Sequence, residues 1–129
     1  MHEGIKTLSG ERLTREGLNG RWVLVNYWAE WCKPCAEEIP ELNQFARQNA
    51  EAVVVLGVNY DGVTGAELRR QVQKLELDFA VAEEDPARLL GLPTPQVLPT
   101  THVLDKQGRY HKTLVGPQTH ASLAAALKD

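Results

Sequence analysis

The chain has 129 residues, of which 43% are hydrophobic and 24% are charged, so it is long enough to form one domain with its own core. Its net charge of -3, without a basic stripe, argues against nucleic acid or an anionic membrane surface as a partner. No apolar run approaches the ~20 residues that cross a bilayer. Residues 1–4 lack the basic start and apolar stretch of a signal peptide, so either the protein is cytosolic or a leader or anchor has been removed.

The first part of the chain predicts a short lead-in followed by a buried strand. The turn-forming pairs Ser9-Gly10 and Asn19-Gly20 predict a small hairpin-like lead-in over residues 8–20. Residues 22–29 are apolar except at Asn26, which is typical of a strand covered on both faces. We therefore expect this strand to lie in the centre of a sheet.

An amphipathic helix is predicted over residues 34–49, because apolar side chains recur there at helical spacing. Charged residues take its other positions: Glu37, Glu38, Glu41 and Arg47. We expect the later elements in the order strand 53–59, helix 65–76, short strand 77–82, short helix 87–90, proline-rich linker 92–99, strands 100–104 and 110–115, and helix 119–128. This order implies an α/β fold, in which a right-handed crossover unit and an antiparallel hairpin share a mixed sheet with helices on both faces.

The chain has only two cysteines, Cys32 and Cys35, and they lie where the predicted strand meets the helix. Two cysteines are too few for a disulfide scaffold, so the pair is better explained by reactivity. A thiol attacks as its thiolate, and Cys32 at the helix N-terminus would face unpaired N–H groups and the positive end of the helix dipole. Cys32 is therefore the predicted nucleophile. Cys35, one turn further and more buried, is the predicted resolving thiol.

Three neighbouring residues complete the predicted site. Lys33 adds a positive charge that favours the thiolate, and Pro34 fits the first helical turn, where its missing N–H is not needed. Trp31 would shield the site and offer an apolar surface for docking. A substrate disulfide would be opened by Cys32 and released when Cys35 displaces it.

Two cysteines can also form half of a zinc site. Tetrahedral zinc would need two further ligands at matching spacing, and the four histidines form no such pair: His2, His102, His111 and His120. The sequence therefore predicts no metal and no bound cofactor. The redox-active group would be the cysteine pair itself.

Two separated stretches resemble the thioredoxin superfamily. Residues 25–35 resemble its active-site segment, and Pro40 resembles the proline that kinks its active-site helix. Leu98-Pro99-Thr100-Thr101, followed by residues 103–108, is similar to its cis-proline loop and the next strand and turn. Within the superfamily, Asn26, the doubled threonine, the lead-in and the insert before the proline loop resemble the TlpA/ResA-type thiol-disulfide oxidoreductases.

This resemblance implies a single thioredoxin-like domain over residues 1–129, with a central mixed sheet, the lead-in and a central insert. It implies that Pro99 is a cis-proline facing the cysteines, which leaves backbone groups of Leu98 free to pair with a substrate strand. It also implies a bacterial periplasmic or extracytoplasmic enzyme, often tethered to the membrane. Such an enzyme reduces disulfides in partner proteins, including those of cytochrome c maturation, with electrons from an upstream donor. We expect a monomer.

Asn26 departs from ordinary thioredoxins, which carry a buried aspartate at this position. Because an amide cannot exchange protons, the base that deprotonates Cys35 must come from elsewhere. ResA-type proteins supply an acid from the turn after the second strand, which makes Asp61 the first candidate and Glu30 the second. The competing interpretation is that Asp61 is a solvated turn residue. Lys33 also departs from the usual glycine or proline, which leaves the reduction potential open.

Other functions use the same fold. A cytosolic thioredoxin-like general reductase would share the chemistry and differ in its location in the cell. A binding or chaperone module would bind partners without turnover. A thioredoxin-fold peroxidase would need a peroxidatic cysteine in a different motif, and the sequence shows none.

Overall fold

The computed structural model describes residues 4–128. The start of the chain, on which the expectations about a signal peptide and about His2 depend, lies outside this range. The elements follow in the order β1 (Ile5–Lys6), β2 (Arg12–Leu13), α1 (Arg15–Leu18), β3 (Trp22–Trp28), α2 (Lys33–Gln48), β4 (Val53–Asn59), α3 (Gly65–Leu75), β5 (Ala80–Val81), α4 (Ala87–Leu90), β6 (Thr100–Leu104), β7 (Tyr110–Val115) and α5 (His120–Ala126). None of the helices within residues 4–128 is long and apolar enough to cross a membrane.

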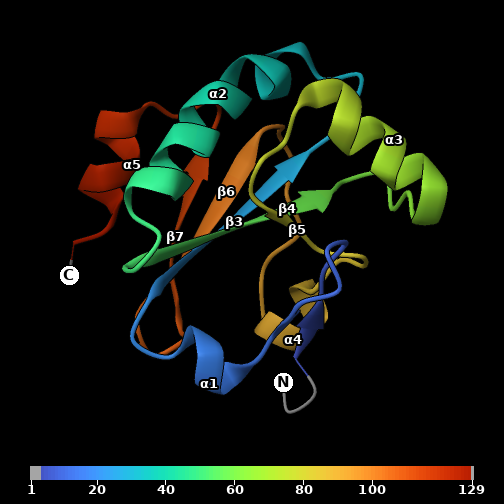
Figure 1. Ribbon diagram of the computed structural model, residues 1–129. Coiled ribbons are helices and arrows are strands. Elements are labelled where there is room, and N and C mark those ends of the chain that lie inside the picture. The colour runs from blue at the N-terminus through green and yellow to red at the C-terminus, as the bar shows by residue number, and fades with distance from the viewer. Residues whose placement is uncertain (1–3, 129) are drawn as a thin grey trace.

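Five strands form one mixed sheet in the order β5-β4-β3-β6-β7 (Figure 1). β3 pairs in parallel with β4 and antiparallel with β6, so it is the central strand that the sequence predicts. β4 also pairs in parallel with β5, and β6 pairs antiparallel with β7. All residues of β3 and β4 are buried, which explains their nearly unbroken apolar sequences. The predicted α/β fold with a mixed sheet is confirmed.

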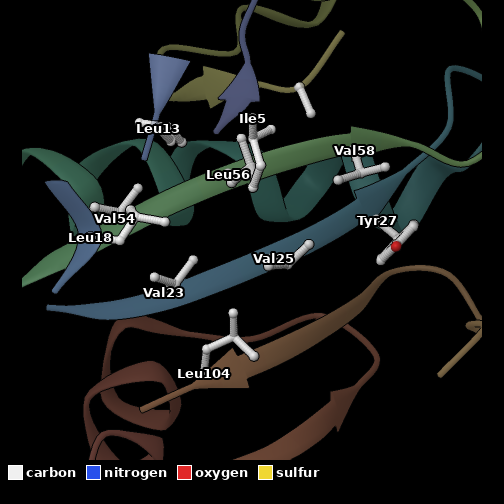
Figure 2. Close-up of a cluster of buried hydrophobic side chains, with 11 residues drawn as sticks. Ile5, Leu13, Leu18, Val23, Val25, Tyr27, Val54, Leu56, Val58 and Leu104 are labelled. Atoms are coloured by element: carbon white, nitrogen blue, oxygen red, sulfur yellow. The ribbon is translucent and has the colours of Figure 1, made fainter. Parts of the chain in front are cut away.

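The long helices and the short elements cover opposite faces of the sheet (Figure 1). On one face, Leu42 and Phe45 of α2 and Leu123 of α5 pack against Leu24 of β3 and Val55 of β4. On the other face, the β1–β2 hairpin and α1 cover the alternate side chains of β3 and β4 (Figure 2). Successive side chains of a strand point to opposite faces, so β3 supplies both cores.

The lead-in differs from the sequence-based expectation. The hairpin is formed by β1 and β2, which pair antiparallel with Ile5 opposite Leu13, so it begins before residue 8. After β2, the chain forms the single helical turn α1, where the predicted lead-in would have continued as a hairpin. Thr14 explains this turn, because its hydroxyl accepts a hydrogen bond from the Gly17 N–H at 3.0 Å and caps the helix.

The middle of the chain also deviates at one point. Only Ala80–Val81 of the predicted strand 77–82 pairs with the sheet. The preceding residues form a loop, because the Asn43 side chain of α2 donates to the Glu76 carbonyl and accepts from the Asp78 N–H. By contrast, α4, β6 and β7 have the predicted bounds.

Candidate active site

Cys32 lies at the junction between β3 and α2, where the chain leaves the sheet through a short turn. Its N–H donates to the Ala29 carbonyl at 3.1 Å, and the residue is the extended N-cap of α2. Its Sγ accepts a hydrogen bond from the Cys35 backbone N–H at 3.2 Å. A disulfide joins the two cysteines, whose Cα atoms are 5.3 Å apart. The helix N-terminus therefore directs an N–H group at the first sulfur, which is the arrangement that stabilises a thiolate.

The surroundings of the pair are mainly apolar. Cys32 and Cys35 are 4% and 1% exposed, and they belong to a buried cluster that includes Trp28 of β3. Pro34 occupies the first turn of α2, and Lys33 lies exposed beside it. The first turn of α2 carries no acidic residue, so no side chain there opposes a negative sulfur.

The proline loop packs against the apolar cluster that contains the cysteines. The Leu98–Pro99 peptide bond is cis. Leu98 is half-buried and packs against the cluster that contains both cysteines. The Pro99 carbonyl accepts the Gly116 N–H at 2.8 Å, which joins the start of β6 to the end of β7. The fold thus brings together two motifs that are far apart in the sequence.

Trp31 lies on the surface next to the pair, with 67% of its area exposed. Its indole Nε1–H donates to the Asp61 carboxylate, on the turn after β4, at 2.8 Å. The first candidate for the proton acceptor is therefore an exposed residue engaged by Trp31. The second candidate, Glu30, accepts a hydrogen bond from Arg70 of α3 at 3.0 Å.

Glu38 is a site residue that the sequence reasoning missed. The helical pattern assigned it to the charged positions of α2, but its side chain is buried, at 2% exposure. Asn26 of β3 donates to one carboxylate oxygen at 3.0 Å, and the Gln118 backbone N–H donates to the other at 2.8 Å. The Asn26 amide also donates to the Thr101 hydroxyl of β6 at 3.0 Å. A carboxylate is thus held one turn beyond Cys35, inside the domain.

Burial raises the pKa of Glu38 to about 7, because desolvation of the charged form outweighs the two hydrogen bonds that favour it. Glu38 therefore changes its protonation near neutral pH. Two signals in the sequence could have identified it. It follows Cys35 by three residues, which places both on one side of the helix. Asn26, a polar residue in an apolar strand, also needed a buried partner.

The described residues form no cluster of metal ligands. Within residues 4–128, no group of three or more His, Cys, Asp or Glu side chains could hold one. The three described histidines lie apart, with the rings of His102, His111 and His120 packed on Tyr27, Trp22 and Phe45, respectively.

The sequence and the structure resemble those of known proteins that are described as thioredoxin-like or as thiol-disulfide oxidoreductases. The sequence model of the AhpC/TSA family matches residues 4–111. The thiol-disulfide oxidoreductase ResA of a Bacillus cereus strain is 28% identical over 125 residues, covering 96% of this chain and 72% of that protein. The thioredoxin-like protein YneN of Bacillus subtilis is 30% identical over 125 residues, covering 95% of this chain and 73% of that protein.

A solved structure described as a secreted thiol-disulfide isomerase from Corynebacterium glutamicum has a TM-score of 0.76 and 25% identity. The match covers 95% of this chain and 79% of that one. The matches to ResA, YneN and this structure each extend over nearly the whole chain. The protein therefore belongs to the AhpC/TSA family, within the thioredoxin superfamily, and is a thiol-disulfide oxidoreductase.

Proposed function

We propose that the protein reduces disulfides in partner proteins by dithiol exchange through Cys32 and Cys35. One observation carries this proposal: the Cys32 sulfur lies at the N-terminus of α2 and accepts the Cys35 N–H at 3.2 Å. A helix N-terminus favours the thiolate, which is the form that attacks a disulfide. The exposed cation Lys33 acts in the same direction.

The two cysteines act in a fixed order. The Cys32 thiolate attacks one sulfur of the partner's disulfide, which forms a mixed disulfide and releases one partner thiolate. The Cys35 thiolate then attacks the Cys32 sulfur, which closes the Cys32–Cys35 disulfide and releases the second partner thiolate. The partner gains two electrons and the dithiol loses two. An upstream donor protein must reduce the Cys32–Cys35 disulfide before the next turnover.

We assign the proton acceptor for Cys35 to Glu38 in place of Asp61. Cys35 must lose its proton before it attacks, and a base is most effective when its pKa lies near the working pH. The pKa of Glu38 is raised to about 7, and its carboxylate is buried one helical turn beyond Cys35. Asp61 is exposed and bonded to Trp31, which supports a role at the surface instead.

Partner proteins bind along the proline loop and Trp31. Within the described residues, neither the N–H nor the carbonyl of Leu98 makes a hydrogen bond, so both are available to an extended partner segment. Leu98 packs against the buried cluster that contains the cysteines, and the exposed face of Trp31 supplies apolar contact.

The proposed partners lie outside the cytoplasm, and cytochrome c maturation is the process that we expect the protein to serve. The similarity to a protein described as a secreted thiol-disulfide isomerase supports this location. A cytosolic general reductase is the alternative, and fractionation of cells that express the full gene product distinguishes the two. A binding or chaperone module without turnover is distinguished by its failure to reduce insulin.

The roles of the two cysteines are tested with serine variants. Cys32→Ser should abolish reduction of insulin disulfides, because no nucleophile remains to open them. Cys35→Ser should trap mixed disulfides with partners, because the second attack is missing. Equal trapping by both variants, or full activity of Cys32→Ser, would contradict the assigned order. The partners trapped in the native organism also identify the process.

A further inference from the structure

Residues 93–98, here called the proline segment, connect α4 to β6 and lead into the cis-proline bond. The segment forms no helix or strand. It makes no backbone-to-backbone hydrogen bond to any other described residue. It nevertheless ends in Leu98, which packs against the buried cluster that contains the cysteines. Something other than backbone pairing must therefore fix its path.

Two side chains of β6 bind the proline segment near its two ends. The Thr100 hydroxyl donates to the Val97 carbonyl. The His102 Nε2 lies 2.9 Å from the Pro93 carbonyl oxygen. Thr100 and His102 are alternate residues of β6, so they face the same side of the sheet. Thr101 between them faces the other side, where it accepts the hydrogen bond from Asn26.

The orientation of the His102 ring is fully determined by its neighbours. The residue is 1% exposed, and its Nδ1 lies 2.9 Å from the Thr113 hydroxyl of β7. Because a carbonyl only accepts, Nε2 carries the hydrogen and Nδ1 accepts from Thr113. Burial lowers the pKa of His102, which favours this neutral form. The rings of Tyr27 and Tyr110 pack edge-on against it, with centroids 5.7 and 6.0 Å away.

A second contact holds the chain just before α4. The Tyr27 hydroxyl donates to the Asp85 carboxylate at 2.6 Å. The same Asp85 oxygen accepts the Ala87 N–H at 2.9 Å, at the start of α4. Tyr27, labelled in Figure 2, lies opposite Thr100 across the β3–β6 pair. Tyr27 thus anchors the chain before α4, and His102 anchors the chain after it. Both contacts are made from the same face of the sheet.

We propose that His102 is a positioning residue for protein substrates: by holding the Pro93 carbonyl, it sets the path of the proline segment that presents Val97 and Leu98 to the partner. The role rests on the proposed function, because it concerns binding of a protein disulfide and not the chemistry at sulfur. A small disulfide needs only access to Cys32. A protein disulfide also needs the backbone of Leu98 in the right place.

The test compares His102→Phe with His111→Phe. Phenylalanine keeps the ring volume and the edge contacts at position 102 but loses both hydrogen bonds. His111 is the matched control, because its Nε2 also lies 3.0 Å from a carbonyl, that of Lys128, and its ring packs on Trp22, away from the cysteines. Two reactions are measured for each protein: the KM and kcat of insulin reduction, and the rate at which the reduced protein reacts with the small aromatic disulfide DTNB.

We expect His102→Phe to raise the KM for insulin by about fivefold or more, since the hydrogen bond that holds the Pro93 carbonyl has been lost. The kcat and the DTNB rate of this variant should stay within about twofold of the wild-type values. In His111→Phe, the KM, the kcat and the DTNB rate should all stay within about twofold of the wild type. An unchanged KM would overturn the proposal, as would a parallel loss of the DTNB rate, which would indicate general damage to the site. A wild-type protein that fails to reduce insulin would instead overturn the proposed function.

A second pair of variants covers the case in which His102→Phe does not fold. Asp85→Asn keeps an oxygen that can accept from Tyr27 and from the Ala87 N–H, whereas Asp85→Ala removes it. If the anchored path of the segment governs substrate binding, Asp85→Ala raises the KM for insulin, whereas Asp85→Asn keeps the KM of the wild type. The rate of reaction with DTNB should be unchanged in both variants. Equal KM values in the two variants and the wild type would refute the proposal.

Discussion

Replacing Glu38 by glutamine tests the buried carboxyl group directly. At pH values below 4.5, the carboxyl group is protonated in both the folded and the unfolded chain. As the pH rises from 4.5 to about 7, the unfolded chain ionises while the folded protein keeps its proton, because burial raises the pKa of Glu38. The folded state is then progressively disfavoured, so the stability that the raised pKa confers at low pH is lost as the pH passes through about 7.

The size of this effect follows from the pKa. One pKa unit corresponds to about 1.4 kcal/mol, so raising the pKa from 4.5 to about 7 makes the free energy of unfolding fall by about 3 kcal/mol across this range. Glutamine cannot ionise, so Glu38→Gln should lack this fall. At low pH it should be less stable than the wild type, because its amide leaves either the Asn26 or the Gln118 donor without an acceptor, and this deficit should shrink as the pH rises through about 7.

Urea unfolding of the oxidised protein at several pH values between about 4 and 8 measures both effects. The difference between wild type and variant isolates Glu38, because the other titrating groups are common to both. His102, whose lowered pKa acts in the opposite direction, cancels in this way. Parallel stability curves for the two proteins would refute the reasoning. In the activity assay, Glu38→Gln should reduce insulin about a hundredfold more slowly and lose the pH dependence centred near 7.

Two further predictions concern the surface and the core. Asp61→Asn keeps an acceptor for the Trp31 indole, so its pH profile of insulin reduction should match that of the wild type. A shifted profile would make Asp61 the proton acceptor. Leu42→Ala removes a fully buried side chain that packs α2 on the sheet, and it should lower the free energy of unfolding by about 2–5 kcal/mol in urea. A loss well below this range would mean that the cavity collapses.

Features that depend only on neighbouring residues are readable from the amino-acid sequence. The cysteine pair, its place at a strand–helix junction and the position of Cys32 at the start of the helix all follow from a few consecutive residues. The same is true of β6 and β7, whose pattern and turn residues fix their bounds. β3 was recognisable as the central strand, because burial on both faces leaves a nearly unbroken apolar run.

The tertiary structure alone decided which polar residues are buried and what satisfies them. Glu38 looks like any other charged residue of an amphipathic helix, and it is buried only because Asn26 and the Gln118 N–H meet it from distant parts of the chain. His102 was one of four scattered histidines until β6, β7 and the proline segment enclosed it. Helical or strand periodicity shows which face a side chain occupies. It does not show the hydrogen-bond partner that makes burial of a polar group tolerable, because that partner is brought in by the fold.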